Sequence, residues 1–280
     1  VVALPEGSGD VGLFRVVTGE RVGLVVGDGH AVAKHAAFLI GDDGVAVTWP
    51  LRYLVAVARR AGEGMQVEAW DATLNYRRVV AAADGHIYAA GYGQTISKLT
   101  KGQERQPIAV RDGGSPVDVV ASRDGQVVAW LSSRGGVEVA KLGAEVVVPL
   151  SVAGATRIAL SGDGAVLAIA TRAAVHVIGA QARVVEVPGE RISEVALSDD
   201  GAWVAAGTID GEVWLWDAAG TLRLVGVGHD QRVSGVAFGD GWVMTAGWDG
   251  VALRWDLSGL ERAPGCLLYT SPSPRDRTRS

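Results

Sequence analysis

Short apolar runs separated by glycine and aspartate dominate the chain, and they are clearest in residues 228–256. Three such runs follow one another there, at 233–238, 242–247 and 251–255. Gly239-Asp240-Gly241 and Asp249-Gly250 separate them, and Asp-Gly pairs tolerate the backbone geometry of tight hairpins. The pattern predicts three antiparallel strands within this segment.

The same punctuation recurs along the chain. Asp-Gly pairs close an apolar run every 37 to 41 residues, at Asp43, Asp84, Asp124, Asp163, Asp200 and Asp240. Self-similarity with a period of about forty residues is typical of a β-propeller, in which each repeat is one small antiparallel sheet. We therefore predict an all-β chain with six recognisable repeats, at 35–70, 76–110, 117–150, 156–187, 192–227 and 233–256.

The segment 228–256 resembles a WD40 repeat. Gly228-His229 begins it, Asp249-Gly250 forms its inner turn, and Trp255-Asp256 closes it. The resemblance implies a WD40-type β-propeller, seven-bladed when complete, with eight blades as the alternative. It also implies a structural tetrad, a buried polar chain formed by His229, Thr245, Asp249 and Trp255. Such a network would fix how neighbouring blades stack.

Other repeats carry less of this signature. Ala140 and Ile178 stand at the tryptophan position of the third and fourth repeats, and Ala206 replaces the threonine in the fifth. These repeats must therefore rest on Val, Ile, Leu and Ala packing. Trp70-Asp71 looks like a second closing dipeptide, but it falls out of phase, so we predict that it ends a fourth strand.

Three segments are expected. Residues 1–34 would be a partial blade with its last two strands, after a polar lead-in at 1–10; residues 35–263 would be the propeller blades. Residues 264–280 differ in composition and period, and 266–280 look like a translated sequencing adapter, so we expect a non-native, disordered tail. Because the chain also begins without methionine, we expect a fragment of a longer, bacterial-type propeller.

Composition narrows the class further. The chain has 280 residues, 48% hydrophobic and 20% charged, which suits a globular protein and not a disordered one. No run of eighteen apolar residues is present, so we predict no membrane span. The formal net charge of −5 argues against a nucleic-acid-binding surface. The single cysteine, Cys266, lies in the expected tail, so the sequence predicts no disulfide, and it leaves the compartment open.

No motif in the sequence points to catalysis. The histidines are His30, His35, His86, His176 and His229, and none has the spacing of a metal site or of a nucleophile with its base. The Asp-Gly pairs are explained by hairpin geometry. We therefore predict no catalytic residue, no metal and no cofactor.

The resemblance implies a non-catalytic scaffold whose loop face, made of inner turns and links between blades, binds a protein or peptide partner. Aromatic and arginine side chains anchor interfaces. The candidates on this face are Arg52, Tyr53, Tyr92, Arg134, Arg172, Arg191, Gln231, Arg232 and Trp248. Two alternatives stay open: a propeller enzyme of the lactonase or quinoprotein type, and a sensor domain of a longer kinase, NTPase or protease chain.

Overall fold

The structure is a computed structural model that describes most of the chain. The described residues are 2–5, 11–14, 21–25, 35–38, 44–49, 54–61, 64–71, 75–109, 114–142, 147–189, 191–258, 260, 268–270 and 277–279. Every regular element assigned in these residues is a β-strand. Contacts between Cα atoms divide the chain into two units, Val1–Ser151 and Val152–Ser280, and each is described by itself.

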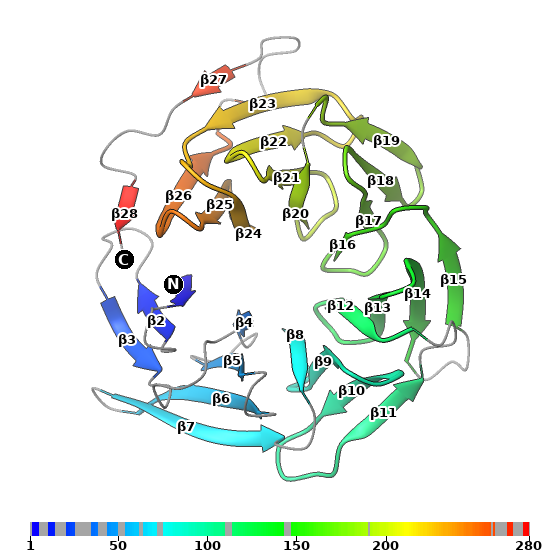
Figure 1. The fold of residues 1–280 in the computed structure, drawn as a ribbon, viewed down its shortest axis with the longest axis vertical. Coiled ribbons are helices and arrows are strands. Elements are labelled where there is room, and N and C mark those ends of the chain that lie inside the picture. Colours follow the sequence, from blue (N-terminus) through cyan, green and yellow to red (C-terminus); the bar gives the residue numbers. More distant parts are fainter. Residues whose placement is uncertain are drawn as a thin grey trace. The chain divides into compact units, whose positions relative to one another are not determined.

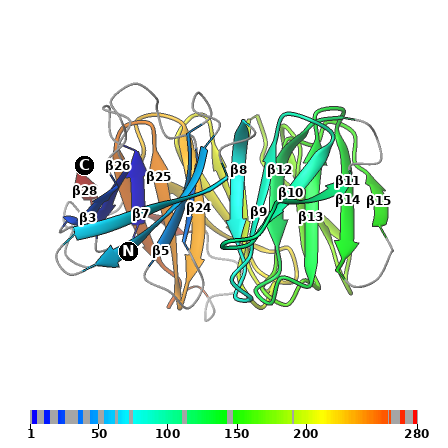
Figure 2. The same ribbon diagram turned by 90° about the horizontal axis from the view of Figure 1, so that it is seen from below.

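The first unit holds four antiparallel sheets of consecutive strands (Figure 1). The first sheet is β1 (Val2–Pro5), β2 (Val11–Phe14) and β3 (Arg21–Val25). The next is β4 (His35–Phe38), β5 (Gly44–Trp49), β6 (Leu54–Ala61) and β7 (Gly64–Asp71). Then follow β8 (Tyr76–Ala81), β9 (Ile87–Gly91), β10 (Thr95–Leu99) and β11 (Gln106–Ala109). The last is β12 (Pro116–Ala121), β13 (Val127–Ser132), β14 (Gly136–Lys141) and β15 (Val147–Ser151), which follow one another in this order across the sheet (Figure 2).

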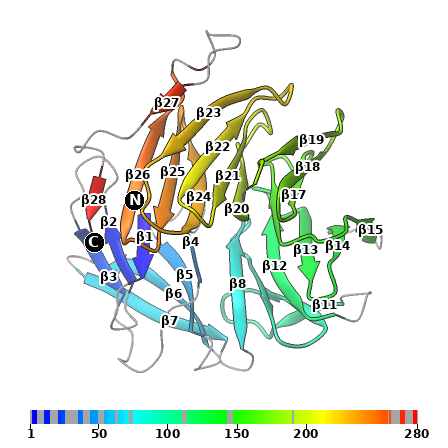
Figure 3. The ribbon, with the colours of Figure 1, turned by 45° about the horizontal axis from the view of Figure 1, so that its top comes forward.

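The second unit repeats this plan. Its sheets are β16 (Arg157–Leu160), β17 (Leu167–Ala170), β18 (Ala174–Ile178) and β19 (Arg183–Glu186); β20 (Ile192–Leu197), β21 (Val204–Thr208), β22 (Glu212–Trp216) and β23 (Leu222–Val227); and β24 (Val233–Gly239), β25 (Trp242–Gly247) and β26 (Val251–Asp256). Figure 3 shows β20 to β23 following one another across their sheet. The predicted all-β, WD40-type β-propeller class is confirmed, and Trp70-Asp71 ends the fourth strand β7 as its phase predicts.

The structure differs from the sequence prediction at both ends of the chain. Residues 1–10 contain β1, which pairs antiparallel with β2, so the first sheet has three strands where two are predicted. The expected disordered tail contains β27 (Leu268–Thr270), parallel to β23, and β28 (Arg277–Arg279), antiparallel to β26. The outer strand of an open sheet leaves backbone N–H and C=O groups unpaired, and an extended segment of almost any sequence can pair with them.

Three of the described Asp-Gly corners share one hydrogen-bonding scheme. Ser161 Oγ donates to Asp163 Oδ1 at 2.6 Å and accepts from the Val166 N–H at 2.9 Å. The Ala165 N–H donates to the same carboxylate oxygen at 2.9 Å, and Gly164 takes a φ of +73°. These hydrogen bonds, led by that from Ser161, hold the pKa of Asp163 below its usual value. The scheme recurs at Ser122-Asp124 and Ser198-Asp200. Hairpin geometry therefore accounts for these aspartates, as predicted.

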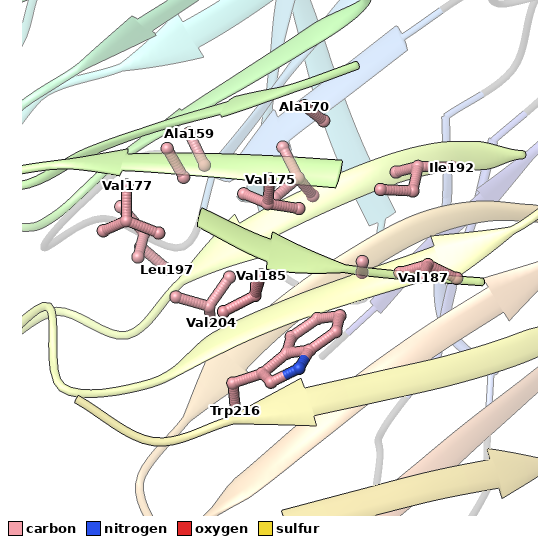
Figure 4. Close-up of a cluster of buried hydrophobic side chains, with 13 residues drawn as sticks. Ala159, Ala170, Val175, Val177, Val185, Val187, Ile192, Leu197, Val204 and Trp216 are labelled. Atoms are coloured by element: carbon pink, nitrogen blue, oxygen red, sulfur yellow. The ribbon is translucent and has the colours of Figure 1, made fainter. Parts of the chain in front are cut away.

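The hydrophobic core lies between consecutive sheets. Figure 4 shows the cluster between the β16–β19 and β20–β23 sheets, where the Trp216 ring lies beside valines such as Val185 and Val204. Val175 and Val204 are fully buried, and burial of a side chain of this size contributes about 1.5–3 kcal/mol. Small residues, including Ala168 and Ala170, let neighbouring sheets approach closely. Aliphatic packing thus replaces the polar chain where that chain is missing.

The first strand of most sheets is irregular just after its first residue. The register shifts between Tyr76 and Arg78 in β8, between Ile192 and Glu194 in β20, and between Val233 and Gly235 in β24. A bulge adds one residue to a strand, bends it and redirects the neighbouring side chains. These bulges lie directly after the links that carry the predicted loop face, so they help to orient its residues.

Candidate functional site

The structure brings His229, Thr245, Asp249 and Trp255 into one chain of contacts, here called the His229 network. His229 Nε2 lies 2.8 Å from Thr245 Oγ1, and the Trp255 Nε1–H donates to the same oxygen at 2.9 Å. His229 Nδ1 lies 3.2 Å from both carboxylate oxygens of Asp249. These contacts are all satisfied when Nδ1 carries the proton and donates to Asp249, while Nε2 accepts from the Thr245 hydroxyl.

Burial shapes the electrostatics of this network. The side chain of His229 is fully buried and that of Asp249 is 8% exposed. Burial alone would raise the pKa of Asp249, but hydrogen bonds from the Val251 and Asp230 N–H groups and from His229 outweigh it, so this pKa lies below its usual value. The carboxylate is therefore an acceptor for two backbone segments as well as for the imidazole.

The His229 network ties a link to a turn. The link 228–232 precedes β24, and the turn 248–250 joins β25 to β26. Asp249 accepts from the Asp230 N–H at 3.0 Å, and the Trp248 N–H donates to the Arg232 carbonyl at 2.9 Å. Both segments are thus fixed from within the sheet, and Trp248, 66% exposed, stands on a rigid backbone.

The same segments line a concave pocket of about 680 Å³ in the second unit. Its walls come from two kinds of loop. The links before first strands, with the starts of those strands, contribute Thr156, Arg191, Ile192, Gln231 and Arg232. The turns between second and third strands contribute Arg172, Ile209 and Trp248.

Backbone hydrogen bonds across the loops hold this pocket in shape. The Ile192 N–H donates to the Arg172 carbonyl at 2.8 Å, and the Ile209 N–H donates to the Arg191 carbonyl at 2.9 Å. The first of these bonds joins two neighbouring sheets, whereas the second, like the bond from Trp248 to Arg232, joins a link to a turn within one sheet. A pocket built in this way loses little conformational entropy when it binds a ligand.

The chemistry of the pocket is cationic and partly apolar. Arg172, Arg191 and Arg232 each supply a guanidinium, and the Arg232 group lies 5.4 Å from the centre of the Trp248 ring, a cation–π contact. Ile192 and Ile209 supply the apolar lining. Arginine with an exposed indole is the combination found in the energetic centres of protein interfaces.

Comparison with known proteins places these features in a family. The protein-family model described as "WD domain, G-beta repeat" matches residues 182–217, which run from the outer strand of one sheet to Trp216-Asp217. Residues 182–217 therefore form a recognisable WD40 repeat, and the resemblance to WD40-repeat proteins is confirmed. The matched repeat is the one with half of the polar signature, whereas the complete His229 network lies in the next WD40 repeat.

Two curated proteins are similar to part of this WD40 chain. Meiotic fizzy-related protein 1 of Schizosaccharomyces pombe is 34% identical over 76 residues, which is 27% of this chain and 17% of that protein. Pre-rRNA-processing protein IPI3 of Yarrowia lipolytica is 31% identical over 86 residues, 29% of this chain and 20% of that protein. The matches thus span about a fifth or less of the relatives' own lengths. Both relatives are eukaryotic, and the bacterial origin stays a prediction.

Five of the predicted partner-binding residues of this WD40 chain meet in the pocket, namely Arg172, Arg191, Gln231, Arg232 and Trp248. Tyr92 and Arg134 belong to the first unit, in the β9–β10 and β13–β14 turns; Tyr92 is half exposed and lies under the Arg77 guanidinium at 4.3 Å. Arg52 and Tyr53 lie outside the described residues.

Sequence reasoning missed three pocket residues: Thr156, Ile192 and Ile209. Ile192 begins a strand and is 6% exposed, so its apolar character suggests core and nothing more. Their equivalent positions in the repeats would have indicated that they lie on the loop face. Thr156 and Ile192 stand at the starts of first strands, and Ile209 directly precedes Asp210-Gly211 in the inner turn. The repeat alignment alone would have placed them beside the predicted arginines.

The enzymatic alternative directs attention to one cluster. Thr100 Oγ1 lies 2.8 Å from His86 Nδ1, but His86 Nε2 and Asp84 Oδ2 are 3.7 Å apart, too far for the hydrogen bond that orients a catalytic imidazole. Asp84 instead accepts from the His86 N–H at 3.0 Å, as a turn residue does. The described part of the chain shows no group of three or more His, Cys, Asp or Glu side chains placed around a common cation position.

Nor does it contain a helix with the length and apolar character needed to cross a bilayer.

Proposed function

We propose that this WD40 chain is a non-catalytic scaffold that binds a protein or peptide partner in the pocket of its second unit. The observation that carries the proposal is the pocket itself. Its aromatic and arginine side chains project from links and turns whose backbone is fixed by hydrogen bonds.

A protein partner suits this surface for two physical reasons. The indole ring of Trp248 is largely exposed to solvent. Burial of such a ring against a partner contributes strongly to the binding free energy of an interface. The pocket also carries Thr156 and Gln231, whose polar groups can donate to or accept from a partner's backbone.

The test compares two variants in a pull-down from cell extract, read by mass spectrometry. Arg232→Ala with Trp248→Ala removes the cation–π pair from the pocket. Arg254→Ala is the matched control, because this guanidinium also lies over a tryptophan, 5.8 Å from the Trp242 ring, but does not line the pocket. We expect the control and the unaltered chain to retain the same proteins, and the double variant to lose at least one of them by about tenfold or more. Equal retention by all three proteins would remove the pocket as the binding site.

The regulatory alternative stays a prediction. A sensor domain of a longer chain would use the same pocket, so these variants do not distinguish a sensor domain from a scaffold. The sequence of the complete gene does.

A further inference from the structure

Within the described residues, the pocket carries three arginines and no carboxylate paired with them. Arg172 and Arg191 are exposed, and within the described residues no carboxylate forms an ion pair with them or with Arg232. Two other arginines of the same unit are paired, Arg157 with Glu194 at 3.0 Å and Arg223 with Asp217 at 2.6 Å. The chain as a whole carries a net charge of −5. Three guanidiniums without an ion-pair partner among the described residues thus line one pocket of an acidic protein, and they are complementary to an anionic ligand.

From this charge and lining we infer that the pocket takes an extended acidic peptide segment, in which carboxylates flank one aliphatic or aromatic side chain. The inference rests on the proposed function and names the chemistry of its partner. The three arginines come from three successive sheets, one each, so they meet separate carboxylates along an extended chain better than they converge on one group. Ile192, Ile209 and the Trp248 ring supply the contact for the apolar side chain.

The surroundings of the pocket argue against a nucleic-acid strand. Asp210 directly follows Ile209, and Asp230 directly precedes Gln231; both are exposed. A strand with a phosphate at every nucleotide would bring negative charge against these two carboxylates as it leaves the pocket. A peptide whose acidic residues are confined to a few positions avoids this repulsion. Flanking neutral or basic residues would even be favoured there.

Fluorescence anisotropy with defined probes tests the inference. The probes are short fluorescein-labelled peptides in which one leucine is flanked by glutamates, the same peptide with glutamines, the same with lysines, the same with phosphoserines, and a single-stranded oligouridylate. We expect the glutamate peptide to bind at least about tenfold more tightly than the glutamine and lysine peptides. We also expect binding to weaken strongly between about 0.1 M and 1 M salt, because the Debye length falls from about 10 Å to about 3 Å.

Variants locate the binding. Arg172→Gln and Arg191→Gln should each weaken the glutamate peptide by about three- to tenfold, and Arg254→Gln should leave it unchanged. Arg172→Lys should recover part of the loss, because it keeps the charge. A glutamine peptide that binds as tightly as the glutamate peptide overturns the inference. So does tighter binding of the phosphoserine peptide or of the oligouridylate, a glutamate peptide that does not bind, or indifference to both arginine variants.

These outcomes separate the inference from the proposed function. If the glutamine peptide binds and Trp248→Ala abolishes its binding, the pocket is a peptide site without the acidic preference. If no peptide binds and the pull-down is also indifferent to Arg232→Ala with Trp248→Ala, both fail.

Discussion

Replacing Thr245 by valine is the sharpest test of the His229 network. Thr245 is fully buried, and its hydroxyl oxygen is shared by the Trp255 Nε1–H at 2.9 Å and His229 Nε2 at 2.8 Å. Valine has nearly the same shape, so the change removes the oxygen without opening a cavity. The indole donor and the imidazole acceptor then both lose their partner inside the sheet.

The structure sets the size of the effect. A buried polar group left without a partner costs about 1–3 kcal/mol, so two such groups give about 2–6 kcal/mol, and the added methyl group returns about 1 kcal/mol. Relaxation is limited, since a Cβ added at Gly226 would lie only 2.3 Å from the Trp255 ring, which shows how closely that ring packs on the neighbouring sheet. We expect the free energy of unfolding to fall by about 1–5 kcal/mol.

Urea unfolding followed by tryptophan fluorescence and far-UV circular dichroism measures this change. The midpoint should fall while the slope of free energy against urea stays the same. Ser234→Ala is the matched control: its hydroxyl donates to the Ala246 carbonyl at 3.2 Å in the same sheet but is exposed, so water replaces it and the loss stays below about 1 kcal/mol. Trp255→Phe completes a double-mutant cycle with Thr245→Val. An equal midpoint shift for Thr245→Val and Ser234→Ala, or strict additivity in the cycle, would refute the reasoning.

Three further predictions follow from single contacts. The pKa of Asp249 is lower in the folded than in the unfolded protein, so the ionised carboxylate stabilises the fold above the unfolded pKa of about 3.9, and this contribution is lost as the pH falls through the folded pKa. The difference in free energy of unfolding between the unaltered protein and Asp249→Asn, measured in urea, should therefore become smaller below about pH 4. Gly211→Ala should lower the melting temperature more than Gly85→Ala does: both glycines have positive φ, but a Cβ at Gly211 would lie 2.2 Å from a backbone carbonyl whereas Gly85 has open space. Arg157→Gln should cost only about 0.5–1 kcal/mol, because its ion pair with Glu194 is partly exposed, and the difference should shrink at about 1 M salt in thermal unfolding.

Local chemistry explains what could be predicted from the sequence. An Asp-Gly corner is specified by two adjacent residues, so Gly125 and Gly164 could be placed in hairpins with positive φ without any tertiary information. The His229 network was accessible only through the resemblance of residues 228–256 to a WD40 repeat, which implies its four members. Short apolar runs without an adjacent Asp-Gly corner could not be predicted as strands. The strand β1, for example, contains only four residues and ends in Pro5.

Contacts between sheets could not be predicted in this way. Ser193 Oγ donates to the Gly207 carbonyl at 3.0 Å and to the Val233 carbonyl at 2.6 Å, the second of these across to the next sheet, yet a serine inside a strand carries no such signal. Arg78 and Asp118 are likewise 3.6 Å apart but separated by a whole repeat in sequence. The composition of the pocket was likewise only partly predictable from the sequence. Its arginines could be assigned to the loop face, but its isoleucines could not be told from core.

The His229 network and the pocket share a segment, and this affects how binding experiments must be read. Asp249 holds the turn that presents Trp248 and the link that presents Arg232, so a change within the network alters the pocket wall as well as the stability of the sheet. Arg172 stands in a different sheet, where Ala173 follows it and no such network ties the turn. Loss of binding by a variant of His229, Thr245, Asp249 or Trp255 is therefore compatible with displacement of the pocket wall, whereas loss by an Arg172 variant of unchanged stability reports the guanidinium itself.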